Sequence, residues 1–111
     1  MGYDVRCKAK LQGMDEWVYV GDEWINISSD AKTVIKEVCG SYPSSWTGKK
    51  CSELYPILMQ GASLLNSSNP SKYAVFLPER AYSSIPRIRD FLMRVADQCD
   101  RYPEAILDVD F

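Results

Sequence analysis

The residues from Tyr3 to Leu11 alternate between apolar and polar side chains, and this alternation constrains the fold more than any other feature of the sequence. The odd positions carry apolar or aromatic residues, and the even positions from Asp4 to Lys10 carry charges. Successive side chains of a β-strand point to opposite faces, so a period of two predicts a strand with one dry face and one wet face. The dry face has to be covered by other elements of the fold.

A return strand and a third short strand are expected next. Residues 12–15 have the composition of a turn, and the aromatic and β-branched run from Glu16 to Val20 is typical of the second strand of a hairpin. Because Gly21 and Asp22 interrupt this run, we expect Glu23 to Ile27 to form a separate strand.

The end of the chain alternates again. Its apolar residues stand on odd positions and two aspartates stand between them: Ala105, Leu107, Val109 and Phe111 against Asp108 and Asp110. If this tail pairs with the first strand, its aspartates lie opposite the cations Arg6, Lys8 and Lys10, and opposite charges across neighbouring strands are favourable. We therefore predict that the tail adds a strand beside the first one.

Three amphipathic helices are expected between these strands. The first has its capping residues at Ser28 to Asp30 and runs from Ala31 to Cys39 before Gly40. The second extends to Leu65, and it either starts or bends near Leu54, because Pro56 stands in its first turns.

The third helix is expected from Ser84 to Arg101, with Ser84 as the N-cap residue and Pro86 in the first turn. Its apolar residues share one face: Ile85, Ile88, Leu92, Val95 and Cys99. The stretch before it, residues 66–83, is expected to be a long irregular loop, and loops of this length are often functional.

These elements, together with the length of the chain, predict one domain. A chain of 111 residues that is 46% hydrophobic is long enough for a single core. We expect an α+β domain over residues 1–111, in which an antiparallel sheet of three or four strands packs against three α-helices. The sheet combines an N-terminal hairpin with a C-terminal strand.

Several kinds of chemistry have no support in the sequence. The chain has no histidine, which removes Ser-His and Cys-His nucleophile pairs and the commonest metal ligand. The cysteines form no C-x-x-C pair, so a structural zinc site has no support either. We expect a protein that is not an enzyme, with no catalytic residue, metal or cofactor.

The remaining composition indicates where the protein acts and on what. The four cysteines, Cys7, Cys39, Cys51 and Cys99, are expected to be buried free thiols of a reducing compartment. The chain has neither an apolar signal sequence nor a stretch of about 20 apolar residues, so we expect a cytoplasmic protein without a membrane partner. Because the net charge is −2 and both signs are interspersed, nucleic acid is not expected as the main partner.

Aromatic residues are the first candidates for binding a partner. Trp17, Trp24 and Trp46 are all expected in or at the edge of the core, and Trp46, which stands in a Ser-rich loop, is the best candidate among them for an exposed anchor. The long loop offers three further aromatic candidates: Tyr73, Phe76 and Tyr82. These three either contact a partner or fold back over the core.

Three arginines of the third helix are the other candidates. Arg87, Arg94 and Arg101 alternate with two aspartates at spacings of three and four, so all five side chains follow one helical stripe. The stripe is either an exposed ladder of ion pairs or a docking surface for a partner.

Four segments resemble a group of small proteins carried by bacteriophages and prophages. They are Met1-Gly-Tyr3-Asp4, Trp24-Ile-Asn26-Ile27, Thr47-Gly48 leading to Pro56-Ile-Leu58, and Arg101-Tyr-Pro103 followed by the acidic tail. A phage context favours a non-enzymatic inhibitor of a host defence factor, such as an anti-CRISPR protein, which acts in the host cytoplasm by binding a protein.

Two alternatives to a defence inhibitor remain open. An immunity protein that neutralises a toxin has the same composition. A protein that sequesters a nucleotide signal needs a cavity on which arginine, lysine and aromatic side chains converge.

Overall fold

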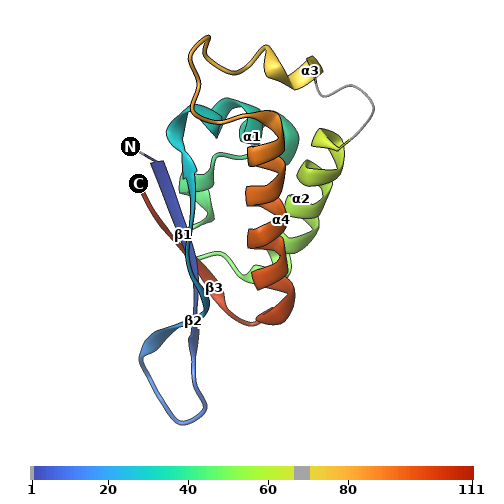
Figure 1. Cartoon of the computed structure of the whole chain (residues 1–111). Coiled ribbons are helices and arrows are strands. Elements are labelled where there is room, and N and C mark those ends of the chain that lie inside the picture. The colour runs from blue at the N-terminus through green and yellow to red at the C-terminus, as the bar shows by residue number, and fades with distance from the viewer. Residues whose placement is uncertain (1, 67–70) are drawn as a thin grey trace.

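Three antiparallel strands form one sheet, and the helices pack on one side of it (Figure 1). The computed structural model describes residues 2–66 and 71–111. The strands are β1 (Gly2–Lys10), β2 (Trp17–Ser28) and β3 (Ile106–Asp110), and they lie in the order β2-β1-β3. The α+β architecture predicted from the sequence is confirmed.

β3 pairs with β1, as the alternation at the two ends of the chain predicts. The register places Asp108 opposite Arg6, and the Nζ atom of Lys8 lies 4.0 Å from Oδ2 of Asp108. The predicted charge pairing fails for the other aspartate, because Asp110 lies opposite Asp4. The alternation thus predicted the pairing of the strands, whereas the register decided which charges meet.

β2 is a single strand of 12 residues where the sequence predicted two. Gly21 has a φ of 78°, and the register with β1 shifts between Val20, opposite Cys7, and Ile25, opposite Val5. The Gly-Asp pair therefore makes a bulge, which bends and twists a strand without ending it.

The helices are α1 (Lys32–Cys39), α2 (Cys51–Leu65), α3 (Ser71–Ala74) and α4 (Ile85–Arg101). α3 is a single turn inside the stretch expected to be irregular, of which residues 67–70 lie outside the described part of the chain. No helix of the described residues is long and apolar enough to cross a bilayer.

The helix starts agree only partly with the predictions. α4 starts as predicted, because the side chain of Ser84 accepts a hydrogen bond from the backbone N–H of Arg87. α2 starts at Cys51, before the predicted position, and includes Pro56.

The capping prediction for α1 is wrong. A short 3-10 turn, η1 (Ser29–Ala31), precedes α1, and neither element has a side-chain cap. The carboxylate of Asp30 accepts hydrogen bonds from the backbone N–H groups of Tyr82 and Ser83 instead. Asp30 therefore fixes the loop that leads into α4.

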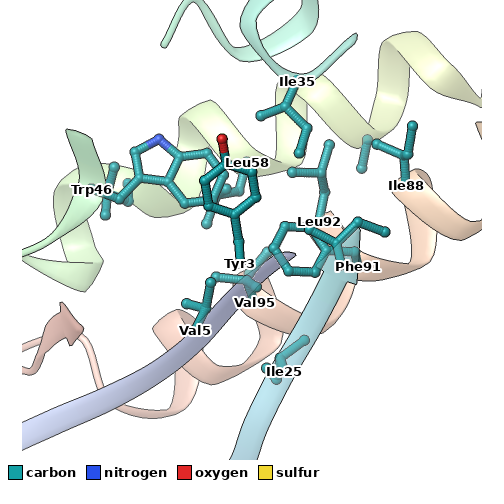
Figure 2. Packing of buried hydrophobic residues seen from close by; sticks show 14 of the residues in the cluster. Tyr3, Val5, Ile25, Ile35, Trp46, Leu58, Ile88, Phe91, Leu92 and Val95 are labelled. Carbon is teal, nitrogen blue, oxygen red and sulfur yellow. The ribbon is translucent and has the colours of Figure 1, made fainter. Parts of the chain in front are cut away.

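The buried side chains form one hydrophobic cluster between the sheet and the helices (Figure 2). The labelled residues of Figure 2 come from the strands, from the helices and from the turn before α2: Tyr3, Val5, Ile25, Ile35, Trp46, Leu58, Ile88, Phe91, Leu92 and Val95. Tyr3, Val5 and Cys7 of β1 belong to this cluster and Ala9 packs against it, which is the period of two that a strand beneath a helical layer requires.

Two neighbours on β3 test this assignment of faces. Leu107 is fully buried, so we expect Leu107→Ala to lower the free energy of unfolding by about 3 kcal/mol through lost burial and a cavity. Ile106 is half-buried and points to the other face, so Ile106→Ala costs less than about 1 kcal/mol. Urea denaturation measures both losses, and equal losses would contradict the assignment.

Candidate functional site

The sheet face that turns away from the helices carries exposed aromatic side chains. Trp17, Tyr19 and Trp24 of β2 are 43%, 45% and 37% exposed. Lys8 and Lys10 of β1 lie directly opposite Tyr19 and Trp17, so their side chains share this face. We call the following six residues the open sheet face: Arg6, Lys8, Lys10, Trp17, Tyr19 and Trp24.

Contacts between aromatic rings and cations order the open sheet face. The rings of Tyr19 and Trp24 meet edge to face, with centroids 5.3 Å apart. The guanidinium carbon of Arg6 lies 4.7 Å from the centroid of the Tyr19 ring, and Nζ of Lys10 lies 5.3 Å from the centroid of the Trp17 ring. Such cation–π contacts hold exposed aromatic side chains in place before a partner arrives.

Asp108 joins this cluster to the third strand. The hydroxyl of Tyr19 donates a hydrogen bond of 2.7 Å to Oδ2 of Asp108, which also faces Lys8. The hydrogen bond and the negative charge of Asp108 raise the pKa of the Tyr19 phenol above its usual value of 10.0. The phenol therefore stays protonated and keeps its hydrogen bond near neutral pH.

A second surface lies between β2 and α4. It is a groove of about 570 Å³, and the following residues line it: Gly2, Ile25, Asn26, Ile27, Ser28, Tyr82, Ser83, Arg87, Asp90, Phe91 and Arg94. We call it the β2–α4 groove. Three predicted binding residues, Tyr82, Arg87 and Arg94, come together here, and Nη1 of Arg87 donates a hydrogen bond of 3.2 Å to the backbone oxygen of Tyr82.

The other predicted binding residues lie elsewhere. Tyr73 is buried and Phe76 is half-buried against the core, so both fold back over the core. Arg101 is exposed at the end of α4 and pairs with Asp97 at 3.3 Å, as the ion-pair ladder predicts. Neither aromatic side chain, nor Arg101, lines the groove.

The core position predicted for the three tryptophans is correct for Trp46 and wrong for Trp17 and Trp24. Trp46 is 0% exposed, because the turn η2 (Pro43–Trp46) directs its indole into the core, where Nε1 donates to Oγ of Ser41. Trp17 and Trp24, expected in or beside the core, lie exposed on the open sheet face. Trp46 is therefore not an exposed anchor.

Sequence reasoning missed the open sheet face for a specific reason. In the run Trp17-Val18-Tyr19-Val20, either alternate pair could face the core, and the larger apolar surface of the aromatic residues favoured the wrong pair. The signal that could have found it is the hairpin register, which places Trp17 and Tyr19 opposite the charged residues Lys10 and Lys8.

The four cysteines are free thiols, as predicted. Cys7 and Cys51 bring their sulfur atoms to 3.7 Å in the core, and Cys99 is buried as well. Cys39 is half-buried, and burial raises the pKa of its thiol to about 12, so it is not a thiolate near neutral pH. No group of metal-ligating side chains forms within residues 2–66 and 71–111.

Comparisons with protein-family models, with curated proteins and with solved structures find no match for this chain. Function is therefore inferred from the two surfaces described above, which differ in chemistry. The open sheet face carries exposed aromatic side chains, whereas the β2–α4 groove is hollow and lined by both polar and apolar residues.

The contact between Tyr19 and Asp108 predicts a change in titration. We expect the pKa of Tyr19 to fall towards 10.0 in Asp108→Ala, because the hydrogen bond and the negative charge that raise it are lost. NMR of ¹³C-labelled tyrosine follows this titration. Asp4→Ala is the control, since Asp4 bonds Asn26 and should leave Tyr19 unchanged.

The raised pKa of Tyr19 also predicts how the effect of Asp108→Ala on the stability of the protein depends on pH. A group whose pKa is higher in the folded than in the unfolded chain stabilises the folded state at every pH below its unfolded-state pKa. This stabilisation is lost as the pH rises through the folded-state pKa. The difference in stability between wild type and Asp108→Ala should therefore stay constant between pH 6 and 8 and shrink in the alkaline range. A difference that shrinks between pH 6 and 8 would contradict this account.

Proposed function

We propose that this protein is a non-enzymatic binding protein that docks on a protein partner through its open sheet face. The observation that carries the proposal is the cluster of Trp17, Tyr19 and Trp24, which is exposed and already ordered by neighbouring cations. Tryptophan, tyrosine and arginine dominate the residues that contribute most to protein–protein affinity. Exposed clusters of this kind mark interaction sites on soluble domains.

The charge pattern favours a protein over a nucleic acid at this face. Asp108 bonds Tyr19 at the centre of the cluster and faces Lys8, so one cation is already neutralised. Asp4 and Asp110 lie opposite each other on the same sheet. A phosphate backbone needs a run of uncompensated cations, whereas a protein surface of mixed charge can match both signs.

The partner that we propose is a host defence factor. This choice is supported by the resemblance of the sequence to phage proteins, and not by the two surfaces themselves. An inhibitor of a nuclease or an effector complex needs a projecting, rigid surface with aromatic anchors and complementary charge, and it needs no catalytic group. In that setting the protein acts in the cytoplasm of the host cell.

Sequestration of a nucleotide is the second candidate function. The β2–α4 groove favours it, because Tyr82, Arg87 and Arg94 converge there as such a site requires. Asp90 lines the same groove between the two arginines and repels phosphate groups. For that reason this function ranks below protein binding.

Affinity capture with matched variants tests the proposal. Tagged wild-type protein, Trp24→Ala and Tyr42→Ala serve as baits in lysates of bacterial host cells. Tyr42 is a suitable control because it is 44% exposed and has Lys36 over its ring, yet it lies outside the open sheet face. We expect wild type and Tyr42→Ala to recover the same protein, and Trp24→Ala to recover about tenfold less or worse.

The outcomes of this capture separate the candidate functions. Equal recovery by Trp24→Ala and wild type would contradict docking through the open sheet face, and recovery of nucleic acid in place of protein would contradict a protein partner. A toxin as the recovered protein would replace the defence factor by the immunity alternative. Nucleotides that raise the melting temperature of a protein without a captured partner would favour sequestration.

A further inference from the structure

β2 is an edge strand, and part of its free edge is already covered. β1 occupies one side of β2, and no strand formed by residues 2–66 and 71–111 occupies the other. At Asp22 the edge is closed by Gln98 of α4, whose Oε1 accepts from the backbone N–H of Asp22 at 2.9 Å while Nε2 donates to Oδ2 at 3.1 Å. Natural proteins cover exposed edges in this way because free backbone groups pair with other chains.

Farther along β2 the edge is open. Ile25, Asn26 and Ile27 form one wall of the β2–α4 groove, and their backbone groups bond to no described residue outside β1. On this edge of β2, the N–H and C=O groups that point away from β1 are therefore unpaired and face the groove. An edge left open beside a groove offers a place for another extended chain.

The opposite wall of the groove is cationic. Arg87 and Arg94 line it from α4, and the guanidinium of Arg94 has no hydrogen bond or ion pair with any described residue. Asp90 lies on the same wall between these arginines and pairs with Arg89 at 3.3 Å. Phe91 contributes an apolar surface between these polar groups.

We propose that the β2–α4 groove binds an extended acidic peptide segment of a partner protein, which adds a strand to the open edge of β2. In this binding mode the backbone hydrogen bonds give affinity and pockets for alternate side chains give selectivity. Acidic side chains of the added strand point towards Arg87 and Arg94. This site is separate from the open sheet face and does not depend on the function proposed for that face.

The dimensions of the groove fit a short strand. The three steps from residue 25 to residue 28 span about 10 Å along a strand, and the seven steps from Arg87 to Arg94 also span about 10 Å along a helix. The volume of 570 Å³ lies within the range of sites that bind small ligands and short segments. A peptide of about four residues can therefore contact both walls at once.

A peptide fits these walls better than a nucleotide does. Donors and acceptors alternate along the β2 edge, which is the pattern of another strand and not of a phosphate chain. Asp90 between the arginines is tolerated by a peptide that places its acidic side chains at alternate positions, whereas a polyphosphate carries charge throughout its length.

Fluorescence anisotropy with a labelled peptide of four Val-Glu repeats tests the proposal. A peptide of four Val-Lys repeats controls for charge, and a Val-Glu peptide with proline at its two central valines controls for backbone pairing, because proline has no N–H group. We expect saturable binding of the Val-Glu peptide, with both control peptides about tenfold weaker or worse.

Two protein variants locate the binding site. Arg94→Glu should weaken binding of the Val-Glu peptide about tenfold or more, because it places a like charge in the groove. Arg101→Glu on the same helix lies outside the groove and should leave binding unchanged. Because the side chains of Arg94 and Arg101 are exposed, we expect both variants to fold, and thermal melting checks this.

Hydrogen exchange distinguishes strand addition from other modes of binding. On peptide binding, alternate amides of residues 25–28 should exchange more slowly, while the amides of β3 should not change. The proposal would be overturned if the Val-Glu peptide did not bind, or if it bound without protecting these amides. It would also be overturned if Arg94→Glu bound the peptide as tightly as wild type does. None of these results bears on capture of a partner through Trp24, so the two proposals fail separately.

Discussion

The pairing of β1 with both other strands is the interaction on which the rest of the structure depends. β1 is the middle strand, and it holds together the two ends of the chain by pairing with β3. Its inward residues Tyr3, Val5 and Cys7 form the floor on which the helical layer packs. Because one face of the strand is apolar and the other is charged, the helices can cover only one side of the sheet.

This one-sided packing explains why large aromatic residues remain in solvent. The core is complete without Trp17, Tyr19 and Trp24, since Trp46 and the apolar faces of α1, α2 and α4 fill the space beneath the sheet. Arg6 and Asp108 contact Tyr19, Lys10 lies over the ring of Trp17, and Trp24 meets the ring of Tyr19 edge to face. Side chains that are ordered before binding lose little conformational entropy when a partner covers them.

The two surfaces arise from the same sheet. The open sheet face is the side that the helices leave uncovered (Figure 1). The β2–α4 groove is lined by residues of β2 on one side and of α4 on the other. Gln98 sets the start of that groove, because it closes the edge at Asp22. Gly21 is required beside it, since a side chain at this position would collide with Gln98 and Tyr102.

Local patterns predicted the elements well, and tertiary contacts account for the failures. The period of two at both ends predicted β1, β3 and their pairing, and Ser84 with Pro86 predicted the start of α4. The α1 cap was wrong because Asp30 bonds the backbone of the distant loop before α4. No pattern within one segment reveals a bond of that kind.

The candidate site could be predicted only in part for the same reason. Helical spacing placed Arg87 and Arg94 on one stripe, but the edge of β2 that faces them follows from the sheet order. Trp17 and Trp24 were misassigned because alternation shows that a strand has two faces and not which face is buried. The hairpin register, which depends on the bulge at Gly21, makes that choice.

Fluorescence of single-tryptophan proteins tests the central claim, that the sheet is covered on one side only. The double variant with Trp17→Phe and Trp24→Phe leaves Trp46, and two further double variants leave Trp17 or Trp24. The account predicts blue-shifted emission that acrylamide barely quenches for Trp46, and red-shifted, readily quenched emission for the other two. Strong quenching of Trp46 together with protection of Trp17 and Trp24 would contradict the account.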